Sequence, residues 1–365
     1  MIPVIQFVLG VAVLVYSAEK LIGYLVGVAS RWAVSLFLIA VVFTGIEFDD
    51  LAFGVVLNME DLSDVALGAV IGTTIALTGI VLALAAIIAP TRVEVPRDYL
   101  ALYVAAPVVM FLLALGGLLT AGTGVVLILL FVAFVGWIAY REYSARRPVW
   151  RNAEVYEQLE KAGVGAGGTT TATVAAGGPP RTDATGTPGF RLPEDLRVDD
   201  GFLKARAQPP GRTVLFAVIA LVGLVVGALI AGRGTEGILE TWAISGTVFG
   251  VTIATLALSL EDILITVEPA RRGAPEIAVA NVLGSVVFSV TGKLGVILLV
   301  GGAIVVDPTA LVWHLPVLLV LTVLSAVFLG TGRIRRWHGV VLLVLYIAYF
   351  VISLTVFGGV PVDDD

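Results

Sequence analysis

Residues 44–50 read TGIEFDD, and residues 256–262 read LALSLED. The second stretch lies 212 positions after the first, and the two align without a gap, so that Asp50 corresponds to Asp262. Each stretch places neighbouring carboxylates inside a long apolar run. Internal similarity of this kind predicts two related halves, each with an acidic pair in a hydrophobic segment.

The match continues beyond the acidic stretches, over residues 44–77 and 256–289. The same offset pairs Asp49 with Glu261, Gly72 with Gly284, and Thr73 with Ser285. Upstream, the WAVS that begins at Trp32 resembles the WAIS that begins at Trp242 at an offset of 210, which indicates a small insertion. The duplication therefore includes more than one segment of each half.

The composition is that of a membrane protein. Hydrophobic residues make up 58% of the chain and charged residues only 14%, whereas about a quarter of a typical soluble domain is charged. The absence of cysteine excludes disulfides and thiolate metal sites. Two histidines are too few for a histidine-based metal site.

A helix needs about 20 predominantly apolar residues to cross the hydrocarbon core of a bilayer. The apolar runs predict ten such spans in an all-α polytopic membrane protein. They cover residues 2–28, 33–57, 64–89, 98–118, 123–140, 213–232, 241–266, 276–302, 309–330 and 336–357. The first span has no basic residues ahead of it and is not followed by a cleavage site, so we expect it to be retained.

The spans divide the chain into two repeats and a loop. Residues 1–140 form the first repeat of five spans, and residues 213–358 form the second. The polar stretch 141–212 between them contains the Gly- and Thr-rich run 163–180, which predicts a partly disordered linker. A short surface helix is expected at 149–161, and residues 359–365 form an acidic tail.

The basic residues predict the orientation, because cytoplasmic loops are enriched in Lys and Arg. If the 141–212 loop is cytoplasmic, all but three of the 22 basic residues fall on that side, the exceptions being Arg233, Lys20 and Lys293. Both termini are then outside, in the cell membrane. Since each repeat has an odd number of spans, the second is inverted relative to the first.

The acidic residues inside the spans are the first candidates for function. A carboxylate in the bilayer interior is costly and must face a partner or water. Glu47, Asp49 and Asp50 lie in the second span, and Glu261 and Asp262 in the seventh. On a helix, Glu47 and Asp50 are three positions apart and share a face.

Hydroxyl residues follow in the next spans. Thr73 lies in the third span, and Ser285 and Ser289 lie in the eighth. Hydroxyl and carboxylate oxygens are hard ligands that suit Ca²⁺ or Na⁺. Lys293 lies on the same stripe as the two serines, too deep to reach the surface easily, and we expect it to pair with a carboxylate as an internal counter-charge.

At these residues the chain resembles the cation/calcium exchanger superfamily, which includes sodium/calcium exchangers, and we interpret it as a divergent archaeal or bacterial member. The family has two inverted five-helix halves and carries a motif of the form G-T-S-x-P-E, then G-N-x-x-G-S-N, in each half. The first motif stands here as residues 45–50 and 68–74, and the second as residues 257–262 and 280–285. The resemblance in layout extends over all ten spans, but it is specific only over about forty residues in each half.

The resemblance implies ion-binding roles for Asp50 and Asp262, with hydroxyl ligands at Thr73 and Ser285. The family's proline is replaced by Asp49 and Glu261, its first serine by Glu47, and a further polar ligand by Leu77. Glu47, Asp49, Glu261 and Ser289 would therefore add charge or coordination, and the whole set is our candidate metal site.

The predicted function is secondary active antiport of Ca²⁺ against Na⁺ or H⁺ by alternating access. One alternative is a proton-coupled exchanger of K⁺ or Na⁺, which Lys293 favours. Another is a non-transporting membrane protein that keeps the fold. We expect no cofactor and no enzymatic activity. The predicted partners are inorganic cations and the lipid bilayer; nucleic acid is not expected, and no protein partner is identifiable from the sequence.

Overall fold

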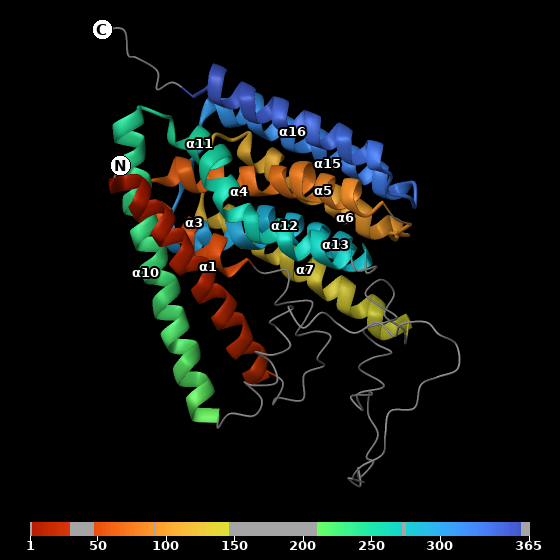
Figure 1. The fold of residues 1–365 in the computed structure, drawn as a ribbon, viewed down its shortest axis with the longest axis horizontal. Coiled ribbons are helices and arrows are strands. Elements are labelled where there is room, and N and C mark those ends of the chain that lie inside the picture. The colour runs from red at the N-terminus through yellow and green to blue at the C-terminus, as the bar shows by residue number, and fades with distance from the viewer. Residues whose placement is uncertain (1, 30–46, 91, 146–209, 272–274, 359–365) are drawn as a thin grey trace.

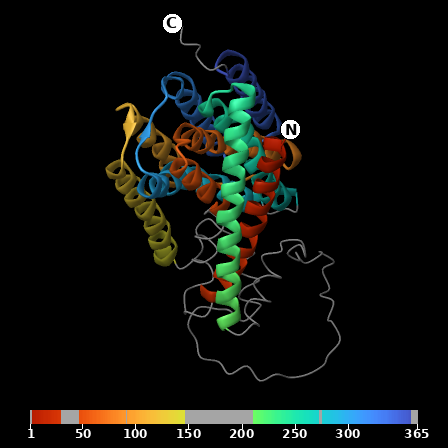
Figure 2. The ribbon, with the colours of Figure 1, turned by 90° about the vertical axis from the view of Figure 1, so that its left-hand side faces the viewer.

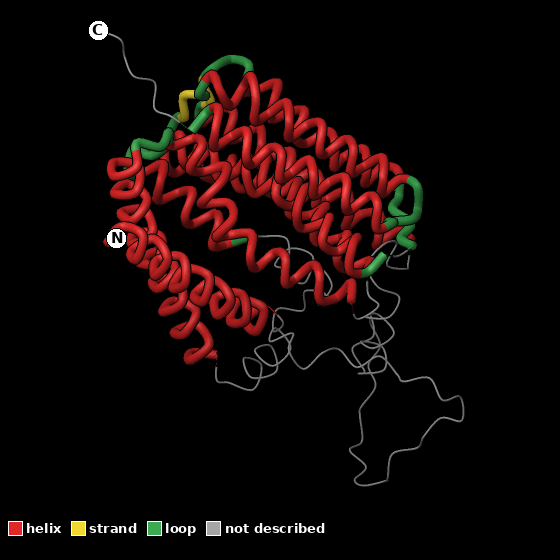
Figure 3. The backbone as a smooth tube through the Cα atoms, turned by 45° about the horizontal axis from the view of Figure 1, so that its top comes forward, coloured by secondary structure: helices red, strands yellow, loops and turns green. Residues whose placement is uncertain are grey.

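The computed structural model describes residues 2–29, 47–90, 92–145, 210–271 and 275–358. Within these ranges the chain is almost entirely helical (Figure 1). The short strands β1 (Leu118–Leu119) and β2 (Ile304–Val305) pair in antiparallel fashion (Figure 3). This strand pair joins the loop before α7 in the first half to the loop after α14 in the second.

The first half contains long helices, one of which has a π-helical turn (η) in its middle. Its elements are α1 (Ile2–Ala29), α3 (Phe48–Met59), α4 (Ser63–Ala76), η1 (Leu77–Val81), α5 (Leu82–Ile88), α6 (Arg97–Ala114) and α7 (Ala121–Ala145). The second half begins with a longer helix and contains three π-helical turns. Its elements are α10 (Pro210–Trp242), α11 (Gly246–Phe249), η2 (Gly250–Ala254), α12 (Thr255–Arg271), α13 (Pro275–Phe288), η3 (Ser289–Lys293), α14 (Leu294–Gly301), η4 (Ala310–His314), α15 (Leu315–Gly330) and α16 (Arg336–Val356).

Nine helices of the described chain are long and apolar enough to cross a membrane. They correspond to nine of the ten predicted spans. The exception is the predicted span 33–57, of which only the part from residue 47 onward is described, where α3 begins at Phe48. The predicted surface helix at 149–161 and the acidic tail 359–365 lie outside the described residues.

The predicted boundary between spans 213–232 and 241–266 was wrong. Helix α10 continues to Trp242, and the next helix begins only at Gly246. Glu236 and Glu240, which fall between the two predicted spans, therefore lie in the last turns of α10. Hydropathy alone ended the span too early because these turns are amphipathic, whereas the helical backbone continues past the apolar run.

The offset of 212 between the two halves is preserved in the helices themselves. Helix α4 and helix α13 begin 212 residues apart, as do η1 and η3, and α5 and α14. A π-helical turn is therefore inserted at the same place in both copies. Such turns are rare and occur frequently at functional sites. Their repetition indicates that both halves keep the same change in side-chain direction at η1 and at η3.

Equivalent helices also make equivalent contacts across the two halves. Helix α3 packs on α14, and its counterpart α12 packs on α5. Similarly, α4 contacts η3 while α13 contacts η1, so that the helix before each of these two equivalent π turns packs on the π turn of the other half. This reciprocal pattern confirms the inverted-repeat architecture that the sequence predicts.

Helices α1 and α10 form a separate antiparallel pair along one side of the bundle (Figure 2). The pair is held close by small residues, as expected where helices associate in lipid. A Cβ added at Gly227 would lie 2.6 Å from the backbone nitrogen of Leu14, and one added at Gly234 would lie 2.4 Å from that of Phe7. The two backbones are therefore in contact along a seam of glycines.

The α1–α10 seam gives a first prediction. Gly227→Leu should force the two helices apart and lower the free energy of unfolding by about 1–3 kcal/mol, as overpacking does. The measurement is the melting temperature of the purified protein in detergent. Gly136→Leu on α7 is the matched control, because a Cβ there meets no atom within 4 Å. Equal melting temperatures for the two variants would show that the seam is not tightly packed.

Candidate functional site

The centre of the candidate site is the ammonium group of Lys293, at the end of η3. The side chain is only 1% exposed. Its Nζ donates hydrogen bonds to Asp50 Oδ2 at 2.6 Å, to Glu47 Oε2 at 2.8 Å and to Thr73 Oγ1 at 3.1 Å. The expected pairing of Lys293 with a carboxylate is therefore present, and it involves two carboxylates instead of one.

The two acids reach Lys293 from different backbone conformations. Asp50 lies in the first turn of α3, whereas Glu47 is the residue before the helix, with φ −79° and ψ 86°. The sequence-based expectation that Glu47 and Asp50 share a helical face was therefore wrong in its geometry. They converge because Glu47 leaves the helical path just ahead of the N-terminus, where the helix dipole also favours negative charge.

Thr73 is placed by the close packing of α4 on η2. A Cβ at the neighbouring Gly72 would lie 2.6 Å from Val251 Cα and 2.0 Å from Thr255 Oγ1. The glycine thus lets α4 approach η2 directly, and Thr73, with no exposed surface, faces the interior. Its hydroxyl accepts from Lys293 and lies within 3.4 Å of the Val70 carbonyl as a donor.

Ser289 joins the same group of side chains. Its Oγ donates a hydrogen bond to Glu47 Oε2 at 3.1 Å. The equivalent position of the first half is Leu77, which begins η1, is fully buried and offers no oxygen. The second half therefore provides two polar groups from η3, Ser289 and Lys293, where the first half provides none.

The remaining acids lie near this centre without bonding to Lys293. Asp49 interacts electrostatically with Asp50, Glu47 and Glu261. Asp262 interacts with Glu47, Asp50, Asp49 and the ammonium of Lys293. The structure therefore brings the five sequence-predicted acids within electrostatic range of one another, between the two halves.

The described part of the chain contains no preformed metal-binding site, because no three acidic or histidine side chains lie close enough together to hold a metal ion. The physical reason is visible at Lys293, whose ammonium stands between Glu47 and Asp50. The structure thus places the predicted residues together, while the coordination of a metal by them stays a prediction.

Several buried oxygens of the cluster have no hydrogen-bond partner among the described residues. They are Glu47 Oε1, Glu261 Oε2, Ser259 Oγ and Ser285 Oγ. Ser285 lies beside Glu47 and interacts with it, although its Oγ makes no hydrogen bond of normal geometry. Buried oxygens are normally paired, so a group of unpaired ones is a place where a cation gains ligands.

Ser259 is a further candidate, because of its burial and its position in the repeat, that the sequence reasoning left out of its set. It is 1% exposed and lies one helical turn before Asp262 on α12. The signal was present, because the offset of 212 makes Ser259 the counterpart of Glu47. A serine in an apolar helix is common and is not by itself a sign of a site, whereas a carboxylate there is rare, although both provide oxygen ligands.

The profile of the family described as "Sodium/calcium exchanger protein" matches residues 2–140 and 212–355. These two ranges are the two repeats, without the segment between them. The chain belongs to the sodium/calcium exchanger family. The family is one of transporters.

Individual curated relatives match only part of this chain, at about 30% sequence identity. The sodium/calcium exchanger MaX1 of Methanosarcina acetivorans is 30% identical over 157 residues, which cover 43% of this chain and 42% of that protein. The human sodium/potassium/calcium exchanger 4 is 30% identical over 126 residues, covering 32% of this chain and 20% of that protein. The matched region thus spans less than half the length of these curated relatives.

The fold is shared with solved exchanger structures. The structure of the sodium-calcium exchanger NCX_Mj soaked with 2.5 mM Na⁺ and 0.1 mM Sr²⁺ superposes with a TM-score of 0.55 at 20% sequence identity. The superposition covers 96% of this chain and 99% of the solved one. At this level of identity the similarity establishes a common fold.

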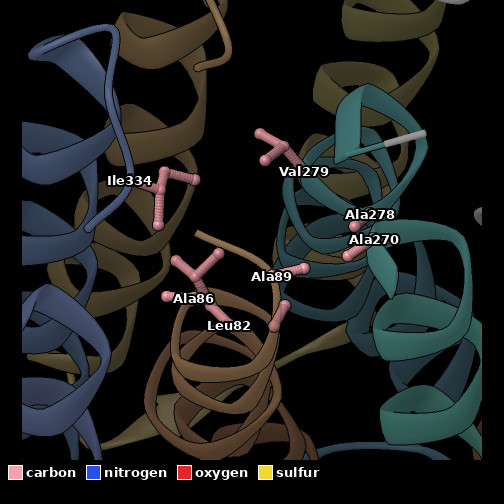
Figure 4. Close-up of a pocket in the computed structure, with 8 residues that line it drawn as sticks. Leu82, Ala86, Ala89, Ala270, Ala278, Val279 and Ile334 are labelled. Atoms are coloured by element: carbon pink, nitrogen blue, oxygen red, sulfur yellow. The ribbon is translucent and has the colours of Figure 1, made fainter. Parts of the chain in front are cut away.

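A small pocket in the structure shares no lining residue with the acid cluster. It is lined by Leu82, Ala85, Ala86, Ala89, Ala270, Ala278, Val279 and Ile334 (Figure 4). All of these side chains are apolar, and none of them bonds to Lys293. The pocket offers no ligand for a cation, and we assign it no part in the site.

The buried ion pair of this family member gives a second prediction. Lys293→Met leaves two carboxylates buried without their partner, which typically costs about 3–5 kcal/mol. The variant should melt at a lower temperature than the wild type in detergent, when choline is the only added cation. The same substitution should cost less in an Asp50→Asn background, because one of the unpaired charges is then absent.

Arg141→Met is the matched control for this cycle. The Arg141–Asp98 pair is partly exposed, with side chains 35% and 29% accessible, and exposed pairs contribute only about 0–1 kcal/mol. Its loss should change the melting temperature little. An identical cost of Lys293→Met in both backgrounds would contradict the ion pair.

Proposed function

We propose that this chain is a secondary active cation antiporter that exchanges Ca²⁺ for Na⁺ or H⁺ at the acid cluster between its two halves. The observation that carries the proposal is the convergence of five acids between the inverted repeats, four of which, Asp49, Asp50, Glu261 and Asp262, occupy equivalent positions. In secondary transporters, substrate and coupling ions bind near the midplane at the interface of such repeats.

The chemistry of the cluster suits hard cations. Carboxylate and hydroxyl oxygens are the ligands that Ca²⁺ prefers. We assign the central roles to Asp50 and Asp262, which occupy the same position in the two halves. Glu47, Asp49 and Glu261 would add negative charge or carry protons, while the hydroxyl ligands would come from Thr73, Ser285 and Ser289.

Exchange requires that the site be neutralised by one cargo or the other, but not by both. A cluster of buried carboxylates is unfavourable when all of them are charged and uncompensated. Loading by Ca²⁺, or by Na⁺ or protons, relieves the same repulsion, and the loads therefore compete. The names of relatives such as MaX1 and the human sodium/potassium/calcium exchanger 4 support a calcium cargo with a monovalent counter-ion.

Alternating access would be provided by the α1–α10 pair. Spans 1 and 6 resemble the moving pair of the family, and here they pack on each other through a continuous seam (Figure 2). Helix α10 also contacts α3, which carries Asp49 and Asp50. Sliding of the pair as one unit would therefore open the cluster to one side of the membrane at a time.

The proposed location is the cell membrane, with the loop 141–212 in the cytoplasm and both termini outside. Arg97 at the start of α6, Arg271 at the end of α12, and Arg336 at the start of α16 support this orientation. These helix ends lie at one end of the bundle (Figure 1). Clustering of basic residues at one membrane face is typical of the cytoplasmic side.

A proton-coupled exchanger of monovalent cations is the second candidate. Lys293 favours it, because a fixed ammonium between Glu47 and Asp50 opposes the approach of a divalent ion to these two acids. The two candidates differ in whether flux depends on Ca²⁺.

Transport by the purified protein in liposomes provides the third prediction. Ca²⁺ uptake should be driven by an outward Na⁺ gradient or by a pH gradient, and the double variant Asp50→Asn with Asp262→Asn should abolish it. Glu236→Gln, at the end of α10 and away from the cluster, should keep the uptake of the wild type. Unchanged Ca²⁺ flux in the double variant would refute the site, while flux that follows K⁺ or Na⁺ and ignores Ca²⁺ would favour the monovalent exchanger.

A further inference from the structure

The environment of Lys293 is that of a bound cation. An ammonium group has three N–H donors and no acceptor. Lys293 Nζ has three oxygen partners, Asp50 Oδ2, Glu47 Oε2 and Thr73 Oγ1, at 2.6–3.1 Å. Every donor therefore has an acceptor, and the positive charge lies inside a set of carboxylate and hydroxyl oxygens with 1% of the side chain exposed.

All three partners of the ammonium belong to the first half, whereas Lys293 belongs to the second. The contacts join positions that are 220 to 246 residues apart in the chain. The ammonium thus fills the first half's oxygen set from across the repeat interface.

The second half has no equivalent of this arrangement in the described residues. The offset of 212 makes Val81 the counterpart of Lys293, and Val81 is fully buried and apolar. The counterparts of the first half's oxygen set are Ser259, Asp262 and Ser285. Among the described residues, Ser259 Oγ and Ser285 Oγ are buried and have no hydrogen-bond partner of normal geometry, although Ser285 lies beside Glu47. One oxygen set therefore holds an ammonium group, while its symmetric copy holds none among the described residues.

The charges agree with this division. The coupled cluster contains five carboxylates, and Lys293 is its ammonium partner among the described residues. Lys293 compensates part of the negative charge at Glu47 and Asp50, and among the described residues no ion pair is formed by Asp49, Glu261 or Asp262. Uncompensated carboxylates in a low-dielectric interior require a cation or a proton.

We propose that the ammonium of Lys293 is a tethered replacement for one monovalent cation: it occupies the position bounded by Asp50 Oδ2, Glu47 Oε2 and Thr73 Oγ1, and the mobile cation binds at the remaining oxygens of the cluster, including those of the second half's set. The number of ions that move per cycle is then one smaller than in the same site without the lysine. Lys293 is in this sense a residue that determines the stoichiometry of exchange. For its transport consequence the inference rests on the proposed function, but its binding consequence does not.

The binding consequence is tested by chemical rescue of Lys293→Met. The thermal unfolding of this variant in detergent is measured in choline chloride and, at equal ionic strength, in NaCl, KCl or NH₄Cl. Removal of the tethered ammonium should lower the melting temperature in choline, and a small cation that enters the vacated oxygen set should restore at least half of the loss with a saturable dependence. The wild type should gain less from the same salts.

Two further variants keep the rescue specific. Lys293→Met with Asp50→Asn should lose the additional stabilisation by small cations, because one oxygen ligand of the vacated set is altered. Lys20→Met should respond to salts as the wild type does, because Lys20 is partly exposed and contacts residues of its own helix, pairing with Glu19 and lying over the ring of Tyr16. A variant Lys293→Met that stays destabilised in every salt would overturn the proposal and leave Lys293 as a structural ion pair.

The transport consequence is tested by the coupling ratio. In liposomes with a clamped membrane potential, the potential at which net Ca²⁺ flux vanishes gives the number of monovalent ions exchanged per Ca²⁺. Lys293→Met should increase that number by one relative to the wild type. An unchanged ratio, together with retained flux, would contradict the proposal. Absence of Ca²⁺ flux in both proteins would instead count against the proposed function, and the rescue experiment would then decide the role of Lys293.

Discussion

The interaction between Lys293 and the carboxylates of Glu47 and Asp50 is the constraint on which the arrangement of the site depends. Charges of either sign are strongly disfavoured in the interior of a membrane protein unless they are paired and hydrogen-bonded. The pair therefore dictates that η3 of the second half must lie against the N-terminus of α3 in the first. The hydroxyl of Thr73 is the third acceptor of the ammonium, and the close packing of α4 on η2 at Gly72 holds Thr73 in place.

The inverted repeat and the π-helical turns explain how two copies of one design produce an asymmetric site. Both halves contain a π turn at equivalent positions, η1 and η3. A π turn adds one residue to the helix and thereby shifts the direction of the side chains that follow. In the second half this turn presents Ser289 and Lys293 to the opposite half, while in the first half it presents the apolar Leu77 and Val81. The backbone is thus duplicated, but the chemistry is not.

Much of the architecture could be predicted from the sequence. The nine described spanning helices agree with the apolar runs. The correspondence of Asp50 to Asp262 between the two repeats followed from an ungapped alignment. Helix ends were less predictable, as α10 shows, because hydropathy reports the apolar core of a span and not where backbone hydrogen bonding stops. The conformation of Glu47 was also beyond prediction, since a helical period was assumed where the backbone had not yet entered the helix.

The sequence by itself determined that the chain lies in a membrane, that it consists of two related halves in opposite orientation, and which acids lie within apolar segments. These properties depend on composition and on local periodicity, which each segment expresses independently of the others. Only the tertiary structure decided that Lys293 binds Asp50, a residue 243 positions away, together with Glu47 and Thr73. Only the structure left the hydroxyl groups of Ser259 and Ser285 without a hydrogen-bond partner among the described residues. The physical reason is that the pairing of a buried charge depends on which helices meet across the repeat interface, and no local pattern of residues records that meeting.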